Sequence, residues 1–153
     1  MIETGENTMT GGRIKRIKEY INEEIFCLTY GDGLAKINLQ KLLNFHSEHG
    51  RLATLTAVKP PGRFGAIQLT EDNLISSFFE KPQGDGGWVN GGFFVLNKKV
   101  FEYINDDETV WEQEPLRNLS MDDQLAAYKL HDFWHPIDTK RDLNYLSDLW
   151  NKN

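Results

Sequence analysis

Cysteine is almost absent from this chain of 153 residues, which has a single one, Cys27. One cysteine excludes a disulfide framework within the chain and a zinc site built from several thiolates. Cys27 stands in an apolar run of β-forming residues. We therefore expect its thiol to be buried and inert.

Long hydrophobic runs and an excess of basic residues are also lacking. No apolar run approaches the ~20 residues that a membrane span needs, and the first residues lack the pattern of a signal peptide. Lys and Arg number 17 against 23 Asp and Glu, which gives a net charge of −6. This acidic balance argues against nucleic-acid and anionic-membrane partners. The sequence predicts a cytoplasmic protein with neither kind of partner.

The composition and patterning that are present predict a folded α/β protein. Hydrophobic residues make up 39% of the chain and charged residues 26%, which is typical of globular domains. Short β-forming runs alternate with amphipathic stretches near the start, which predicts parallel βαβ units. Residues 64–69 and 74–80 predict a hairpin, so the sheet is expected to be mixed.

The remaining expected elements follow from periodicity and from helix start and stop signals. Asn38 is expected to cap one helix, and Gly50 to end it. The other expected elements are strands at 25–30, 52–58, 88–96 and 125–130, helices at 14–21, 39–49, 98–104, 110–120 and 139–150, and a loop at 131–138.

An aspartate between two glycines, Asp32, follows the strand expected at 25–30. In open α/β sheets, ligands bind beyond the carboxyl ends of the strands. Mg²⁺ at phosphate sites uses one or two carboxylates together with substrate oxygens, so Asp32 is a candidate metal ligand. Taken alone, these residues favour a simple Gly-Asp-Gly turn.

Asp138 is the natural partner carboxylate for Asp32. It stands immediately before the last expected helix. The alternative interpretation is that Asp138 or Thr139 caps this helix. The metal interpretation gains weight only when the two aspartates are taken as a pair.

Polar residues stand at the end of one expected strand and inside another. Lys81 can bind a phosphate as a point charge, and Glu80 can accept hydrogen bonds from sugar hydroxyls. The alternative for both is a solvated strand end. Asn90 and Gly91 lie inside an apolar run, where a polar amide must find partners in the protein or in a ligand.

The remaining candidates are weaker. Thr10-Gly11-Gly12-Arg13 combines glycines, a helix start and a guanidinium, which suits an anion, although a capped helix start explains it equally. The four histidines show no metal-ligand spacing and are expected on the surface or in loops. They are His46, His49, His131 and His135.

Seven motifs occur along the chain in the order found in a known family. They are Thr4-Gly5 with Thr8-Met9-Thr10-Gly11-Gly12-Arg13, Tyr30-Gly31-Asp32-Gly33, Pro60-Pro61-Gly62-Arg63-Phe64-Gly65-Ala66, Phe79-Glu80-Lys81-Pro82, Asn90-Gly91-Gly92-Phe93-Phe94-Val95, Trp111-Glu112-Gln113-Glu114-Pro115-Leu116 and Phe133-Trp134-His135-Pro136-Ile137-Asp138-Thr139. Together they resemble the sugar nucleotidyltransferases, in the glucose-1-phosphate cytidylyltransferase branch. The resemblance covers nearly the whole chain.

The resemblance implies a partial Rossmann-like nucleotide-diphospho-sugar transferase fold. It also implies a reaction in which glucose-1-phosphate attacks the α-phosphate of CTP, giving CDP-glucose and pyrophosphate. The implied setting is a homo-oligomer that makes a nucleotide sugar for cell-surface polysaccharide.

The resemblance further assigns roles to single residues. It makes Asp32 and Asp138 the Mg²⁺ ligands, and these two with Lys81 the catalytic residues. The implied nucleotide contacts are Thr8, Gly11, Arg13 and Gly31. The implied sugar-phosphate contacts are Glu80, Lys81, Asn90, Gly91 and Thr139.

Two departures from the family pattern qualify this expectation. The glycine-rich loop that opens the family and wraps the triphosphate does not occur here. Residues 1–153 are thus expected to be the C-terminal portion of a single nucleotidyltransferase domain, inactive alone. The alternatives are a non-catalytic remnant that binds sugar phosphate or oligomerises, and a product without function. Lys36, where the family has an acidic or amide residue, either competes with a metal or points to solvent.

Overall fold

The computed structural model describes residues 1–60, 66–69, 75–79 and 87–152. The chain divides into two compact units, and each is built from three separate stretches. The first unit comprises Met1–Thr29, Asn38–Thr56 and Gly92–Tyr128. The second comprises Tyr30–Ile37, Ala57–Gly91 and Lys129–Asn153.

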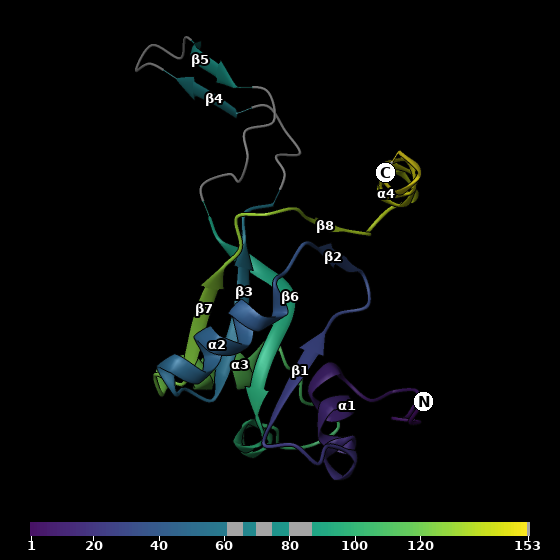
Figure 1. Cartoon of the computed structure of the whole chain (residues 1–153), viewed down its shortest axis with the longest axis vertical. Helices are drawn as coiled ribbons and strands as arrows, with labels where there is room; N and C mark the ends of the chain where they lie inside the picture. The colour runs from purple at the N-terminus through teal and green to yellow at the C-terminus, as the bar shows by residue number, and fades with distance from the viewer. Residues whose placement is uncertain (61–65, 70–74, 80–86, 153) are drawn as a thin grey trace. The chain divides into compact units, whose positions relative to one another are not determined.

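A four-stranded sheet with the strand order β1-β6-β3-β7 runs through the first unit, and the unit boundary falls within three of its strands (Figure 1). The helices and strands that build it are, in chain order, α1 (Thr10–Arg16), the 3-10 helix η1 (Lys18–Tyr20), β1 (Ile25–Thr29), α2 (Leu39–His49), β3 (Ala53–Val58), β6 (Val89–Asn97), the 3-10 helix η2 (Lys98–Tyr103), α3 (Glu114–Met121) and β7 (Leu125–Lys129).

The sheet is mixed, as the sequence predicts. β1 pairs antiparallel with β6. Between β3 and β7, Ala53 N–H donates to the Gln124 carbonyl, and Leu130 N–H donates to the Ala57 carbonyl. The partners advance in the same direction along both strands, so β3 and β7 are parallel (Figure 1).

Burial along the strands follows their place in the sheet. Phe94, Val95 and Leu96 of β6 are all buried, because this interior strand is covered on both faces. β1 lies at the edge and alternates between exposed and half-buried residues. Cys27 is therefore exposed, and our expectation that it is buried is wrong. Partial desolvation still raises the pKa of its thiol.

Helix α2 begins and ends where the sequence predicts. The Asn38 side chain accepts a hydrogen bond from Lys41 N–H, and Gly50 follows the helix with a φ of 64°. Leu42 and His46 are the buried residues of this helix. Our expectation of a surface or loop position is thus wrong for His46, because the helical spacing puts it on the same inward face as Leu42.

His46 and His49 share one buried hydroxyl. His46 Nδ1 and His49 Nε2 each lie 2.8 Å from Thr54 Oγ1. A hydroxyl can donate to one ring nitrogen and accept from the other, which suits two neutral imidazoles. Desolvation lowers the pKa of both histidines, and the neighbouring imidazole lowers the pKa of His46 further.

We expect the free energy of unfolding to fall as the pH drops below about 6.5, the ordinary histidine pKa. The folded pKa values are lowered, so the unfolded chain binds more protons in acid. The stability that the neutral pair contributes is therefore present above that pH and is lost below it. Urea denaturation between pH 7.5 and pH 5.5 measures the change.

Two variants test the assignment of this effect. Asn at position 46 and Gln at position 49 keep a nitrogen near Thr54 without a titrating ring, so the His46→Asn/His49→Gln variant should show a flatter pH profile. His131→Gln, at an exposed histidine, should keep the wild-type profile. An unchanged profile in the double variant would contradict the assignment.

Helix α3 begins later than the sequence predicts. α3 begins at Glu114 rather than at 110, and Pro115 lies in its first turn, where proline is tolerated. Trp111 precedes the helix and is fully buried, with its ring centroid 6.0 Å from that of Phe94. Its backbone N–H donates to Thr10 Oγ1 over 2.9 Å. This tryptophan thus ties the start of α1 to the core.

The second unit contains short strands and one long helix. Its elements are β2 (Gly33–Ala35), β4 (Ala66–Leu69), β5 (Ile75–Phe79), β8 (Trp134–Pro136) and α4 (Lys140–Asn151). β4 and β5 form the predicted antiparallel hairpin. β2 and β8 form a second antiparallel pair, so the loop expected at 131–138 is partly wrong. A strand of three residues gives too short a pattern to predict without its partner.

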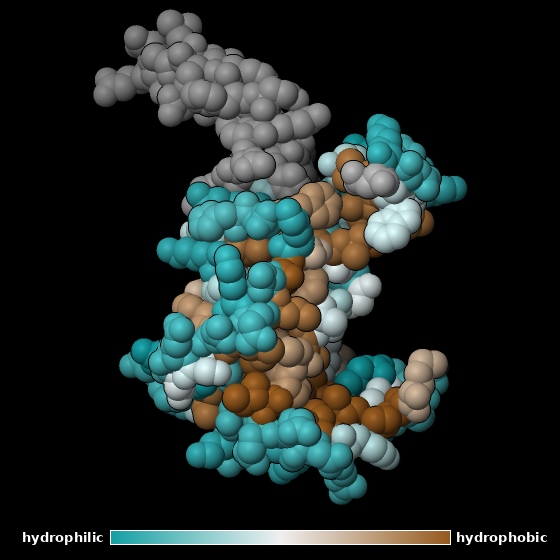
Figure 2. All heavy atoms as spheres, in the orientation of Figure 1, coloured by the Kyte–Doolittle hydropathy of each residue, from teal (hydrophilic) through white to brown (hydrophobic). Residues whose placement is uncertain are grey.

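Hydrophobic surface remains visible on the face shown in Figure 2. Exposed apolar residues include Ile25 on β1, Leu34 on β2 and Trp150 on α4. Over the described part of the chain, every helix falls short of the length or the apolar character that crossing a membrane requires.

Candidate functional site

The β2–β8 ladder brings the two candidate metal ligands to the same place. Gly33 pairs with Pro136, and Ile137 N–H donates to the Asp32 carbonyl over 2.7 Å. Asp138 follows Ile137 directly, so the backbones of Asp32 and Asp138 lie at the same end of this ladder. Both aspartates are exposed. The ladder thus brings the backbones of two exposed aspartates to one place.

Among the described residues, these carboxylates are not part of a cluster of three or more His, Cys, Asp or Glu that could hold a metal. Such a pair fits Mg²⁺ only where a ligand supplies further oxygens, which is how this ion usually binds at phosphate sites. The donor set therefore suits a metal that arrives with a phosphorylated substrate.

The start of β6 is attached to the same turn. Asn90 Nδ2 donates to Tyr30 Oη over 3.1 Å, and Tyr30 stands two residues before Asp32. Trp134 Nε1 donates to the Gly91 carbonyl over 2.8 Å, which joins β8 to β6. The predicted site residues Asn90 and Gly91 thus have firm contacts within the second unit.

Sequence reasoning missed Tyr30 and Trp134 as residues that build this site. Both stand in motifs quoted for the family resemblance, next to the candidate ligands. Their positions inside the Tyr30-Gly31-Asp32-Gly33 and Phe133-Trp134-His135 motifs were the available signal. The half-buried phenol of Tyr30 and indole N–H of Trp134 each have a hydrogen-bond partner on another strand.

Thr139 caps helix α4. Its hydroxyl accepts from Asp142 N–H over 3.2 Å, and the Asp142 carboxylate accepts from Thr139 N–H over 2.9 Å. This reciprocal pair is a capping box. The helix-cap alternative is therefore confirmed for Thr139.

Lys36 has a partner other than a metal site. Its Nζ lies 3.8 Å from Asp132 Oδ1, and both side chains are largely exposed. An ion pair this exposed contributes little to stability. The Lys36 ammonium thus lies beside the carboxylate of Asp132 and not beside that of Asp32.

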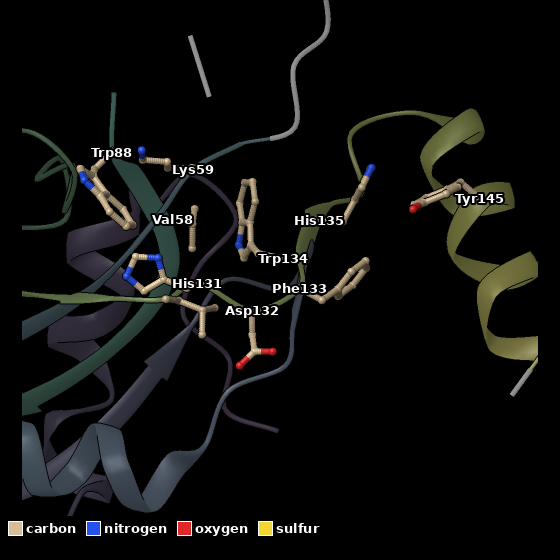
Figure 3. A pocket seen from close by; sticks show the side chains of 10 residues that line it. Val58, Lys59, Trp88, His131, Asp132, Phe133, Trp134, His135 and Tyr145 are labelled. Carbon is tan, nitrogen blue, oxygen red and sulfur yellow. The ribbon is translucent and has the colours of Figure 1, made fainter. Parts of the chain in front are cut away.

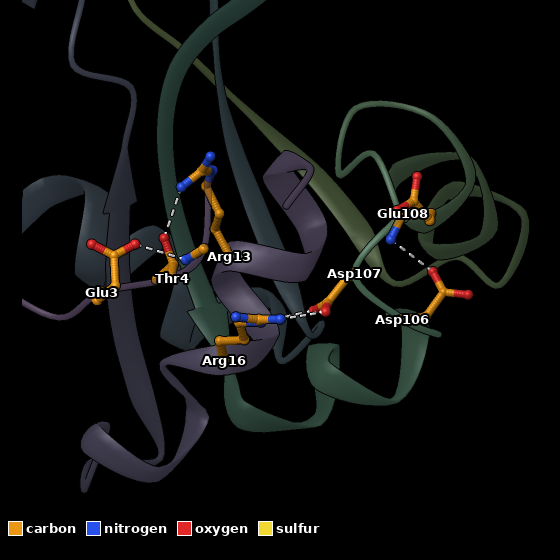
Figure 4. A network of polar contacts seen from close by, with 8 residues as sticks. Glu3, Thr4, Arg13, Arg16, Asp106, Asp107 and Glu108 are labelled. Atoms are coloured by element: carbon orange, nitrogen blue, oxygen red, sulfur yellow. Dashed lines mark hydrogen bonds and ion pairs between the residues drawn. The ribbon is translucent and has the colours of Figure 1, made fainter. Parts of the chain in front are cut away.

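The candidate nucleotide contacts Thr8, Gly11 and Arg13 lie in the first unit. Both of the glycines expected in a loop before the helix are inside α1, which begins at Thr10. Arg13 Nη1 donates to Thr4 Oγ1 over 2.8 Å (Figure 4). Its Nη2 donates to the carbonyl of Glu6 over 3.1 Å. The guanidinium thus holds the N-terminal segment against α1.

A neighbouring arginine forms a stronger contact. Arg16 Nε donates to Asp107 Oδ1 over 2.9 Å (Figure 4). This hydrogen bond, assisted by the charge of Arg16, lowers the pKa of the Asp107 carboxyl. Met9 N–H donates to the Asp107 carbonyl over 2.8 Å. Together these contacts fix α1 on the segment that follows η2.

Gly11 has a packing reason to lack a side chain. A Cβ on Gly11 would lie 2.7 Å from the Thr109 carbonyl oxygen, which itself accepts from Gly11 N–H. At Gly31 a Cβ would meet nothing within 4 Å. Gly31 is exposed beside Asp32, and no packing contact with a described residue explains its missing side chain.

We expect Gly11→Ala to lower the free energy of unfolding by about 1–3 kcal/mol, the usual range for overpacking. The backbone oxygen of Thr109 cannot rotate away as a side chain can. Gly87→Ala is the control, since a Cβ there meets no described residue within 4 Å. Urea denaturation of both variants measures the difference, and equal stabilities would contradict the packing account.

Glu80 and Lys81 lie outside the described residues. Their expected roles at the sugar phosphate stay predictions. The described residues therefore bring together Asp32, Asp138, Asn90 and Gly91, with Thr139 beside Asp138 in the chain.

Comparison with known proteins gives consistent matches. The family model for nucleotidyl transferases matches residues 3–150. A glucose-1-phosphate cytidylyltransferase of Salmonella typhi is 50% identical over 153 residues, which is 99% of this chain and 59% of the relative. A probable glucose-1-phosphate cytidylyltransferase of Bacillus subtilis (strain 168) is 46% identical over 152 residues, again 59% of its length. The chain thus spans less than two thirds of the curated relatives it matches.

Solved structures share the fold. HddC from Yersinia pseudotuberculosis, complexed with GMP-PN, has a TM-score of 0.70 at 22% identity, over 98% of this chain and 65% of that one. A UDP-glucose pyrophosphorylase complexed with UDP-glucose has a TM-score of 0.70 at 14% identity, over 99% and 65%. The α/β fold with its mixed sheet is the Rossmann-like fold of these proteins. With a family model that matches nearly its whole length, the chain belongs to the nucleotidyl transferase family.

Proposed function

We propose that this chain supplies the sugar-phosphate side of a glucose-1-phosphate cytidylyltransferase site. In the proposed reaction, a phosphate oxygen of glucose-1-phosphate attacks the α-phosphate of CTP. A P–O bond forms to the sugar phosphate, and the P–O bond to the leaving pyrophosphate breaks. The products are CDP-glucose and pyrophosphate.

The observation that carries the proposal is the β2–β8 ladder. It holds Asp32 and Asp138 at one end through the 2.7 Å hydrogen bond from Ile137 N–H to the Asp32 carbonyl. Identity of 50% to a glucose-1-phosphate cytidylyltransferase along the chain supports this choice of sugar phosphate and nucleotide.

In the proposed site, Asp32 and Asp138 hold Mg²⁺. The ion, when bound, supplies positive charge that neutralises the phosphates as they are drawn together. Asn90 and Gly91 orient the sugar, together with Glu80 and Thr139, and Lys81 binds its phosphate. On the nucleotide, Gly31 contacts the ribose side, and Thr8, Gly11 and Arg13 contribute further contacts. These groups act by positioning and by charge, as in phosphoryl transfer generally.

The biological setting is part of the same proposal. We infer a cytoplasmic homo-oligomer that makes a nucleotide sugar for cell-surface polysaccharide. We further propose that residues 1–153 correspond to the C-terminal portion of the enzyme's nucleotidyltransferase domain. The relatives' names support the chemistry, and the motifs found in the sequence are the basis for the placement.

We expect this chain to bind glucose-1-phosphate with an affinity no better than about millimolar, in a manner that requires Lys81. A single ammonium–phosphate contact in an open, wet site contributes only about 1–3 kcal/mol. Titration calorimetry with Mg²⁺ on the wild type and on Lys81→Ala measures this. Lys41→Ala, at an exposed lysine of α2, is the control for loss of one charge.

The second candidate is a non-catalytic protein that binds the sugar phosphate. Release of pyrophosphate from CTP and glucose-1-phosphate separates the two candidates. Equal glucose-1-phosphate binding by wild type and Lys81→Ala would overturn the role proposed for Lys81 at the sugar phosphate.

A further inference from the structure

A tryptophan and two lysines lie where three neighbouring strands begin or end, on the same side of the sheet's strand ends. β3 and β7 are parallel, so Lys59, just after β3, and Lys129, the last residue of β7, lie at the same edge. The far end of β6 pairs with the start of β3, since Asn97 N–H donates to the Leu52 carbonyl. Trp88, just before β6, therefore comes to that edge as well. Ligands of open α/β sheets bind beyond such strand ends.

Both ammonium groups lie against the same indole ring. Lys59 Nζ is 5.3 Å and Lys129 Nζ is 5.6 Å from the Trp88 ring centroid. The His131 ring meets the same indole edge-on, with 5.4 Å between centroids. The negative face of the indole attracts each cation and so keeps two like charges near each other.

Within the described part of the chain, no carboxylate forms an ion pair with either lysine. The nearby acid Asp132 is paired with Lys36. Two ammonium groups close to one ring repel each other, and an anion that binds them reduces that repulsion.

Lys59, Trp88 and His131 border a pocket of about 300 Å³, which Asp132 also lines and Lys129 does not. Figure 3 shows Lys59 and His131 beside Trp88 at one side of it, with Trp134 and Tyr145 further along. This volume is at the lower end of the range for small-molecule sites. The pocket thus carries the Lys59 ammonium beside an aromatic lining, and Lys129 lies outside it against the Trp88 ring.

We propose that Lys59, Lys129 and His131, gathered around Trp88, form a second anion site that takes a phosphoryl group. The two ammonium groups bind its oxygens, and the His131 ring supplies a further hydrogen-bond donor. None of these residues belongs to the set proposed for cytidylyl transfer. The phosphoryl group can be free phosphate, pyrophosphate or the phosphate of a sugar, and the experiment separates these sources.

The test follows the Trp88 indole N–H signal by NMR in the ¹⁵N-labelled full chain at pH 7.5, assigned with Trp88→Phe. Inorganic phosphate, pyrophosphate and glucose-1-phosphate are titrated separately. We expect a saturable shift of this signal that is at least about tenfold weaker in affinity in Lys59→Met and Lys129→Met. Methionine keeps the length and the packing on the ring but removes the charge. Lys41→Met, on α2, should bind as the wild type does.

The variant Lys81→Ala distinguishes binding at this second site from binding at the proposed reaction site. The Trp88 shift should persist in Lys81→Ala with each probe, even where calorimetric binding at the reaction site is lost. The probe that saturates at the lowest concentration identifies the source of the phosphoryl group. A shift that disappears in Lys81→Ala, or one that is equal in the wild type and both methionine variants, would overturn the proposal.

Discussion

Replacing Asp138 by Asn should remove the Mg²⁺-dependent part of glucose-1-phosphate binding, and Asp32→Asn should do the same. The β2–β8 ladder holds the two residues at one end, so a metal shared with the phosphate needs both. Asn keeps the size of the side chain but loses the negative charge that Mg²⁺ prefers in a ligand. We expect the affinity measured with Mg²⁺ to fall at least about tenfold, to the value measured with EDTA.

Asp148→Asn is the matched control for this result. Asp148 is an exposed acid of α4 in the same unit, and the variant makes the same change of charge. Titration calorimetry with Mg²⁺ and with EDTA should give wild-type values for it. If either Asp32→Asn or Asp138→Asn keeps the full Mg²⁺ dependence, the pair is only a turn and a helix boundary.

Truncation of Trp111 should have the largest effect on stability. Trp111 is fully buried, packs edge-on against Phe94 at a 75° interplanar angle, and donates its backbone N–H to Thr10. Removing a buried aromatic ring loses its transfer free energy and leaves a cavity. We expect Trp111→Ala to lower the free energy of unfolding by about 3–5 kcal/mol.

Trp150→Ala provides the comparison, because this tryptophan of α4 is 84% exposed. It should change the free energy of unfolding by less than about 0.5 kcal/mol in urea denaturation. Trp111→Phe keeps part of the packing, so a smaller loss remains measurable if the alanine variant does not fold. A Trp111→Phe variant as stable as the wild type would contradict the core role of this residue.

Elements with local signals were predicted well from the sequence. Helix α2 has Asn38 at its start and Gly50 after its end, and both act as the sequence predicts. β8 was missed because its three residues form a strand only through β2, about a hundred residues earlier in the chain. Cys27 was misplaced because β-forming residues alone do not show that a strand lies at an edge.

The candidate site shows the same division. Asp32 could be predicted as a site residue because it follows a strand, and Asp138 because it precedes a helix. The contact between their segments depends on the β2–β8 pairing, and the contacts of Asn90 with Tyr30 and of Trp134 with Gly91 depend on strands that are distant in sequence. The close contact of Gly11 with Thr109 could not be predicted either, because the two residues are far apart in the sequence.

The central claim is that one metal site on Asp32 and Asp138 lies beside the phosphate of glucose-1-phosphate. Mn²⁺ in place of Mg²⁺ tests it most directly, through its effect on the ³¹P relaxation of glucose-1-phosphate bound to this chain. Our account predicts strong ³¹P broadening that depends on the protein and is lost in Asp32→Asn/Asp138→Asn but not in Asp148→Asn. Equal broadening in the wild type and in the double variant would contradict it.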